Sequence, residues 1–335
     1  MACAPKSHAI SFNLDSIAEW GKFARFCVNT YRWGDRFFNT RDTAYVVGTG
    51  TKFNIKLTSD FWADQYRFDF VPHGNVNMFS DVASNIGLHL TYMAVSVGYD
   101  MNINKFFNGY ESTRKRINFA FNCQLFGAEF YINNNDITTN ITSISNGGQT
   151  IRPHVKFDGI SNDRWGFDIY YFLNNKRYSQ AAAFSYSKLQ RRSQGSWYFG
   201  LSFCNQRYNF EFSRLPQEVL DYLPKSWDTY NYGVNTNTFS IKAGYGYNWV
   251  LGPHWLLAIS ESPTVGYRTG HVNSWLKNSL GINNILRFSA VYNYKHLFLG
   301  MVGHINTSLV RDPESTLVAN VYLAEFSIGY RFNLW

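Results

Sequence analysis

Residues 239–249, FSIKAGYGYNW, carry the pattern that decides the fold. Bulky apolar side chains (Phe239, Ile241, Ala243, Tyr245, Tyr247, Trp249) alternate there with small or polar ones (Ser240, Lys242, Gly244, Gly246, Asn248). A period of two is typical of a β-strand, whose successive side chains point to opposite faces. A soluble sandwich would bury the apolar face and place many charges on the other. Here the second face is small and mildly polar, as in the lumen of a transmembrane barrel.

The same alternation runs from about residue 51 to the end of the chain. Its apolar phase slips by one residue between Tyr92 and Val95 and again at Leu125/Phe126, which indicates tight turns. We expect fourteen strands, near 51–70, 82–92, 94–103, 115–125, 127–136, 150–160, 164–174, 178–190, 196–212, 237–250, 256–270, 284–295, 297–310 and 318–335. Twelve is the alternative, because 150–160 and 178–190 are weakly patterned. The sequence therefore predicts an all-β fold, a transmembrane antiparallel up-and-down β-barrel.

Composition is compatible with this fold. Aromatic residues make up 19% of the 335 residues and charged residues 16%, with a mean hydropathy of −0.28. No apolar run approaches the roughly 18 residues that a membrane-spanning helix needs. A large soluble β-protein with an aromatic core would share these numbers, and the alternation favours the barrel.

The first fifty residues follow a different period. Ser16 and Glu19 have the spacing of a capping box, which predicts a helix over residues 14–40. An apolar stripe then recurs every three or four residues, at Ile17, Trp20, Ala24, Cys27 and Tyr31. We expect two parts, a periplasmic helical segment over 1–50 and a barrel over 51–335.

The last strand predicts the location. Seven residues from Tyr322 to Leu334 alternate, and the chain ends on Trp335, which is out of phase with them. This end resembles the C-terminal strand by which the barrel-assembly machinery recognises its clients. We expect a bacterial outer-membrane protein with both termini in the periplasm. The start, MACAPKSHAIS, lacks the apolar stretch of a signal peptide, so we expect a mature form with an added Met.

Connection lengths predict which end faces outward. Short connections at 92–94, 125–127, 251–255 and 295–297 fall on the periplasmic side, and long ones at 71–81, 104–114, 137–149, 213–236 and 271–283 fall outside. The longest of these loops holds Trp227, Tyr230 and Tyr232. Their rings either pack on the barrel mouth or form a constriction or ligand platform.

One stretch resembles a known family. YYFLNNKRYSQAAAFSYSKLQRRSQGSW, from Tyr170 to Trp197, is similar to the signature of an uncharacterised Bacteroidetes barrel family, the domain of unknown function 4421 family. Ten positions match: Asn174, Lys176, Ser179, Ala182, Ala183, Gln190, Arg192, Ser193, Gly195 and Ser196. Ala181 stands where members often have Pro, so the local turn is expected to differ. The resemblance implies a fold and a location but no activity.

By phase, several titratable side chains point into the lumen: His89, Glu129, Asp168, Lys242, Arg287 and His304. Opposite charges inside a barrel either form a salt-bridged closure or line a selective passage. The chain shows no phosphate loop, zinc spacing or EF-hand, so no cofactor and no metal are expected. Cys123 and Cys204 are expected to be packing residues.

The net charge of +8 is spread along the chain, which argues against nucleic acid. Arg114-Lys115-Arg116 and Arg191-Arg192 lie beside strand ends, as solvated loop charge or as contacts to lipopolysaccharide phosphates. Other expected partners are outer-membrane lipid and a periplasmic or surface protein. Three functions remain open: a channel or uptake pore, an accessory barrel that binds a partner, and, less favoured, a lipid-active enzyme. No Ser/His motif is recognisable.

Overall fold

The computed structural model describes residues 19, 21–70, 74–104, 113–221, 231–272, 278–311 and 315–333. Its elements are α2 (Lys22–Asn39), β1 (Val46–Gly48), β2 (Phe53–Phe70), β3 (Gly74–Ser80), β4 (Ala83–Tyr92), β5 (Val95–Asn102), β6 (Thr113–Asn122), β7 (Phe126–Asn146), β8 (Gln149–Ile151), β9 (Val155–Phe172), α4 (Gln180–Phe184), β10 (Lys188–Gln190), β11 (Gln194–Glu211), η1 (Phe212–Arg214), α5 (Gln217–Leu220), β12 (Asn231–Leu251), β13 (Trp255–Val272), β14 (Asn278–Tyr294), β15 (Leu297–Arg311) and β16 (Ser315–Phe332). None of these helices is long and apolar enough to cross a membrane.

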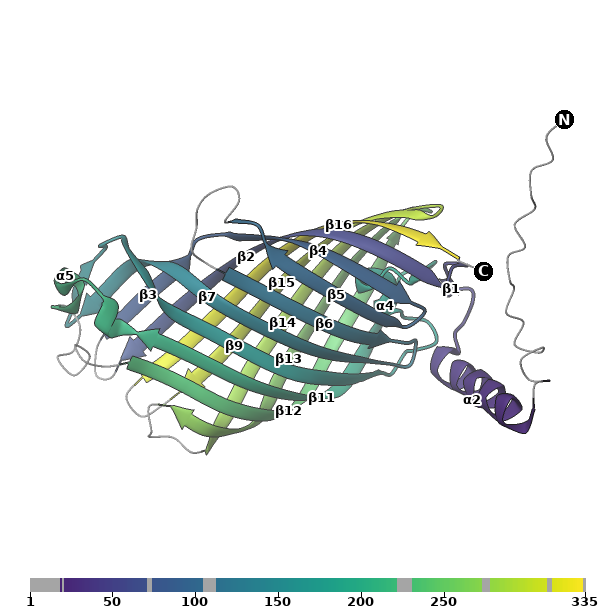
Figure 1. The fold of residues 1–335 in the computed structure, drawn as a ribbon, viewed down its shortest axis with the longest axis horizontal. Helices are drawn as coiled ribbons and strands as arrows, with labels where there is room; N and C mark the ends of the chain where they lie inside the picture. Colours follow the sequence, from purple (N-terminus) through teal and green to yellow (C-terminus); the bar gives the residue numbers. More distant parts are fainter. Residues whose placement is uncertain are drawn as a thin grey trace.

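A 14-stranded antiparallel sheet closes on itself to form the barrel (Figure 1). β16 pairs with β2 over its whole length, from Ser315 opposite Phe70 to Phe332 opposite Phe53. Of the 14 described strands, β3 and β8 lie outside the continuous ring: β3 bridges β2 and β7 at one end, and β8 extends β7. Twelve strands therefore form the closed ring, and the all-β barrel expected from the alternation is confirmed.

Three of the expected strands were placed wrongly. Residues 150–160 and 164–174 fall largely on the single strand β9, because the polar run Asn162-Asp163-Arg164 lies within the strand and not in a turn. Residues 178–190 form α4 and the short β10. Conversely, residues expected in the loops at 71–81 and 137–149 form β3 and the end of β7.

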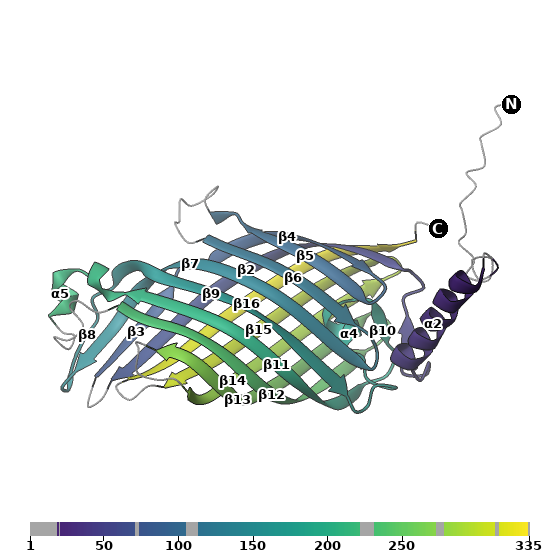
Figure 2. The same ribbon diagram turned by 60° about the horizontal axis from the view of Figure 1, so that its bottom comes forward.

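The barrel has two distinct ends (Figures 1 and 2). The tight connections after β4, β6, β12 and β14 lie at the end where α2 and the end of β16 are found. We call this the terminal end and the opposite one, which holds α5, the distal end. The predicted grouping of the four tight turns at one end is confirmed.

The outer surface is apolar around the terminal part of the barrel. The exposed fraction is 58% for Phe239, 70% for Ile241, 43% for Trp165 and 51% for Ile328. A water-soluble protein would bury such side chains, whereas contiguous exposed apolar surface marks contact with another apolar phase. A closed β-barrel with an apolar outer band is the outer-membrane type of barrel.

Polarity reverses along β2. In its first half the outward residues include Ile55 and Leu57, and the inward residues include Thr58 and Asp60. In its second half the outward Arg67 is charged, and the inward residues Tyr66 and Phe68 are apolar. β2 has 18 residues, while a tilted strand needs only about 9–11 to cross a membrane. The distal part of the barrel therefore projects beyond the lipid and has an apolar interior, like a soluble protein.

The N-terminal helix lies outside the ring, beside the terminal end (Figure 2). Gly21 precedes it with a φ of 145°, and α2 begins at Lys22, later than expected. Ser16 lies outside the described residues, and Glu19, its expected partner in the capping box, precedes the helix. The backbone N–H groups of Gln124 and Leu125 donate to the carbonyl of Phe38, which ties the end of α2 to the turn between β6 and β7.

Candidate functional site

The middle of the lumen is crossed by ion pairs. Arg287 on β14 lies 3.7 Å from Glu129 on β7, and several strands separate the two around the ring, so this pair spans the interior. The Nζ of Lys242 on β12 lies 2.9 Å from Asp168 on β9, across β11. Both side chains of the second pair are nearly inaccessible, at 4% and 7%. The structure thus brings four of the sequence-derived lumen residues together as two pairs.

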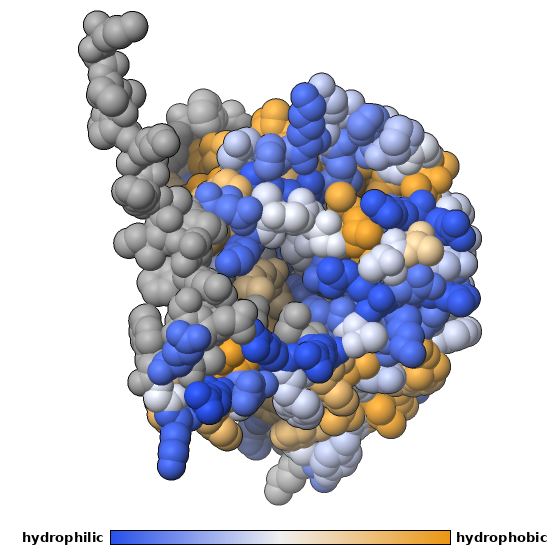
Figure 3. Space-filling view, turned by 90° about the vertical axis from the view of Figure 1, so that its right-hand side faces the viewer, coloured by the Kyte–Doolittle hydropathy of each residue, from blue (hydrophilic) through white to orange (hydrophobic). Residues whose placement is uncertain are grey.

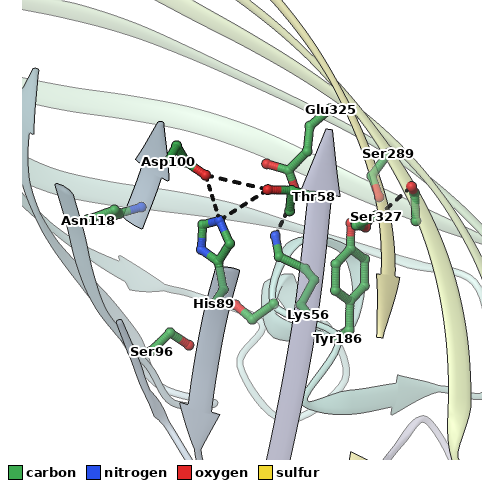
Figure 4. Close-up of polar contacts among 12 residues, drawn as sticks. Lys56, Thr58, His89, Ser96, Asp100, Asn118, Tyr186, Ser289, Glu325 and Ser327 are labelled. Carbon is green, nitrogen blue, oxygen red and sulfur yellow. Dashed lines mark hydrogen bonds and ion pairs between the residues drawn. The ribbon is translucent and has the colours of Figure 1, made fainter. Parts of the chain in front are cut away.

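A second group of polar side chains lies nearer the terminal end (Figure 4). His89 Nε2 is 3.0 Å from Asp100 and 3.5 Å from the hydroxyl of Thr58. Lys56 donates to Glu325 at 2.6 Å. These side chains come from β2, β4, β5 and β16, which are neighbours on one wall of the barrel.

The contacts of His89 differ from those of a catalytic histidine. A catalytic relay uses one ring nitrogen toward the acid and the other toward the nucleophile. Here the contacts to Asp100 and Thr58 both involve Nε2, whereas Nδ1 lies against Gly98, where a Cβ would overlap it. The arrangement fixes the imidazole to the wall and differs from such a relay.

Sequence reasoning placed the basic run on β6 wrongly. Arg114 is 4% exposed and pairs with Asp64 inside the barrel. Arg116 also turns inward, and its guanidinium lies 5.7 Å from the ring of Trp62. Only Lys115 points out. The loop interpretation failed because these residues lie within a strand, where the period of two sends alternate charges into the lumen.

These side chains surround two cavities, of about 140 Å³ toward the terminal end and about 100 Å³ beyond it. Both are lined by Arg116, Glu129, Arg287 and His304, so the cavities adjoin at the Arg287–Glu129 pair. The Nε2 of His304 is buried without a hydrogen-bond partner. We call the two cavities together the lumen chamber.

A plug closes the lumen chamber at the terminal end. It consists of residues 173–193, the connection between β9 and β11, and contains α4 and β10. This is most of the stretch that carries the family signature. Its three central alanines are at most 2% exposed, and Phe184 and Ser185 line the chamber.

Side chains of the barrel wall hold the plug by its backbone carbonyls. In each of five hydrogen bonds a side chain donates to a backbone carbonyl of the plug. The donor and the residue of the carbonyl are Gln124 and Tyr178 (2.6 Å), Asn248 and Ser179 (2.9 Å), Ser289 and Ala183 (2.6 Å), Asn54 and Ser185 (3.2 Å), and Arg331 and Tyr186 (2.9 Å). The plug also joins the chain that follows α2, because β10 pairs with β1. These contacts of the wall therefore depend on the path of the plug backbone.

Two glycines of the wall make room for tyrosines of the plug. A Cβ at Gly246 would overlap the hydroxyl of Tyr178, and one at Gly300 would overlap the hydroxyl of Tyr186. Burial raises the pKa of Tyr186 to about 12, so its phenol stays protonated at neutral pH. The fit between rings and glycines makes the closure specific to this segment.

At the distal end an apolar cluster fills the barrel. It includes Tyr66, Phe68, Phe210 and Tyr232, and the ring of Phe68 lies 4.9 Å from that of Phe210 and 5.0 Å from that of Tyr232. Tyr232 is 1% exposed on β12, so its expected place on an extracellular loop is wrong. Trp227 and Tyr230 lie outside the described residues.

Sequence reasoning missed several lumen residues, above all Asp60. It is 0% exposed, and neither of its carboxylate oxygens has a hydrogen-bond partner. Its even number places it in phase with Lys56 and Thr58, so the alternation of β2 could have found it. No pattern in the sequence indicated that the plug enters the lumen.

Comparison with known proteins gives a family and a fold type. The family model described as domain of unknown function (DUF4421) matches residues 40–332. No curated protein matches the sequence.

Solved outer-membrane proteins resemble the chain at low identity. The outer membrane protease OmpT from Escherichia coli has 6% identity and a TM-score of 0.39, over 85% of this chain and 98% of that one. The translocator domain of autotransporter NalP from Neisseria meningitidis has 9% identity and a TM-score of 0.36, over 95% of this chain and 98% of that one. The P. putida toluene transporter TodX has 9% identity and a TM-score of 0.29, over 84% of this chain and 90% of that one. Such values transfer no activity to this chain.

Proposed function

The chain belongs to the family described as domain of unknown function (DUF4421), and we propose that this member is a gated channel for small polar solutes. One observation carries the proposal: a charged chamber lies between the two seals of the lumen, and one seal is a connection and not a strand. A barrel with only a structural role could fill this space with packed side chains. Here charged groups surround open volume, as in a passage.

The plug is the natural gate. Its ends are fixed to β9 and β11, and its middle is held by hydrogen bonds that each stabilise by about 0.5–1.5 kcal/mol. A segment held in this way can leave the lumen without unfolding the ring. The Arg287–Glu129 pair would then be the narrowest point left in the chamber, and conduction also requires the second seal, the distal cluster around Phe68, to part.

We place the protein in the outer membrane of a bacterium of the Bacteroidetes type, with the terminal end in the periplasm. The short turns at this end and the long strands at the other support the orientation. Lipopolysaccharide and the barrel-assembly machinery are the partners that this location implies.

Liposome swelling in small sugars tests the channel. Gly246→Val/Gly300→Val should displace Tyr178 and Tyr186 from the wall and speed swelling several-fold over wild type. Gly303→Val is the matched control, because a Cβ there would meet only Phe288, at an ordinary 3.6 Å. Wild-type swelling rates in a folded double variant would contradict gating by the plug.

An accessory barrel that binds a periplasmic protein is the second candidate. It is favoured by the exposed aromatic side chains of α2, where Phe23 is 80%, Phe26 66% and Trp33 63% exposed. Co-purification from native membranes with and without α2 tests it. A lipid-active enzyme has the least support, because the contacts of His89 to Asp100 and Thr58 both involve Nε2 and differ from a catalytic relay.

A further inference from the structure

A third cavity lies on the other side of the plug, at the terminal end of the barrel. Its volume is about 330 Å³, larger than either part of the lumen chamber. The plug residues Tyr186, Ser187 and Lys188 form one wall, and the chain after α2 and the end of β16 form others. Figure 3, which views the terminal end, shows a recess bordered by hydrophilic side chains. We call this space the terminal cavity.

Its charge is of one sign. Among the residues that the structure describes, Arg41, Lys52, Lys188 and Arg331 line it, and no carboxylate side chain does. In the lumen chamber, Lys56 and Arg287 each lie within 4 Å of a carboxylate. Cations gathered around one recess repel each other and attract an anion.

Arg331 adds to the need for an anion because it is deeply buried. Arg331 is only 2% exposed. Its guanidinium donates to two neutral acceptors, the carbonyl of Tyr186 at 2.9 Å and the amide oxygen of Asn293 at 2.6 Å. Burying a cation without a counter-charge is unfavourable. A bound anion would supply that charge.

Polar atoms without partners lie in the same wall. The Nε of Arg41 and the hydroxyl of Ser187 are buried and lack a hydrogen-bond partner, so two donors await an acceptor. The amide oxygen of Asn54, on a residue only 5% exposed, lacks a donor. A ligand that satisfies all three needs oxygen acceptors and also a hydrogen-bond donor, and a sugar that carries an anionic group supplies both.

The volume of the terminal cavity narrows the class of ligand further. Liquid water occupies about 30 Å³ per molecule, so the terminal cavity has room for a ligand several times larger than a lone phosphate ion. We propose that the terminal cavity is a binding site for a small phosphorylated or carboxylated sugar from the periplasm. Binding there does not require the lumen to conduct, so this site stands independently of the gated channel.

Calorimetry on the purified full chain in detergent, at low ionic strength, tests the site. The probes are glucose 6-phosphate, glucuronate and uncharged glucose, which separate phosphate from carboxylate and both from the sugar alone. We expect wild-type protein to bind at least one of the two anions and to bind glucose much more weakly. Equal binding of glucose, or no binding of either anion, would overturn the proposal.

Variants locate the binding. Arg41→Gln/Lys188→Gln should weaken the affinity for the bound anion at least tenfold, and Lys52→Gln, at an exposed position, serves if the double variant does not fold. Lys295→Gln is the matched control, since Lys295 loses the same charge in a turn at the same end but lies outside the cavity. Unchanged affinity in both cavity variants, or an equal loss in the control, would show that the terminal cavity is not the site.

Discussion

Neighbouring residues on one strand meet opposite environments in this barrel. On β12, Ile241 is 70% exposed on the outer face, while the next residue, Lys242, is 4% exposed and paired with Asp168. Alternation along the sequence was enough to predict both directions. It could not predict the pairing of Arg287 with Glu129, because contacts across the lumen depend on how the ring closes.

Ile241→Arg tests the outer face at the scale of one residue. A cationic side chain at a lipid-facing position near the membrane centre should lower the free energy of unfolding by about 2–4 kcal/mol. Denaturant titration in lipid vesicles measures it, with Ile241→Leu as the apolar control. Equal stability of the two variants would place Ile241 away from lipid.

A double-mutant cycle tests the Lys242–Asp168 pair. Lys242→Ala leaves a buried carboxylate without its cation and should cost about 3–5 kcal/mol. Lys242→Ala/Asp168→Asn removes both charges and should recover part of that loss. Strictly additive effects of the two single changes would show that the pair is not coupled.

At the scale of elements, the strands were predictable and the plug was not. Strands with bulky outer residues, such as β12, stand out because lipid requires apolar side chains on every second position. β9 was split because its distal part lies beyond the lipid, where outward residues such as Asp163 can be polar. The plug has no periodic signal, since its position depends on wall residues distant in sequence, such as Asn248 and Ser289.

Asn248→Ala tests how the plug is held. The Nδ2 of Asn248 donates to the Ser179 carbonyl at 2.9 Å and to Gln190 at 3.2 Å, and the residue is 0% exposed. Each lost hydrogen bond should cost about 0.5–1.5 kcal/mol, and the loss of both should make trypsin cleavage at the plug lysines and arginines about tenfold faster or more. Asn235→Ala, on the outward face of the same strand, should leave the rate unchanged. Equal cleavage rates in both variants would mean that Asn248 does not hold the plug.

At the scale of the whole molecule, the barrel combines a membrane part and a soluble part. The terminal half has an apolar outside and a charged inside, and the distal half reverses this, with the cluster around Phe68 as its core. The reversal falls within single strands, so one continuous ring serves both environments. The sequence showed the alternation of apolar and polar residues. It did not show that the apolar residues point outward in the terminal half and inward in the distal half, because this depends on where the strand leaves the lipid.

The closed ring predicts resistance to detergent. Since β16 pairs with β2 over its length, no strand edge is free in the ring, and the folded barrel should migrate faster than the boiled chain on gels. Circular dichroism in detergent should be β-rich. A monodisperse folded state without detergent would contradict the membrane part.

The central claim is that the lumen opens only when the plug leaves it. Ala183→Cys/Ser289→Cys places one thiol on the plug and one on β14, at residues in contact in the closed state through the Ser289 hydroxyl and the Ala183 carbonyl (2.6 Å), and oxidation should link them. In planar bilayers, with Cys3 and Cys27 replaced by Ser, we predict channel openings under reducing conditions and none after oxidation. The same conductance in both states, zero included, would contradict the account.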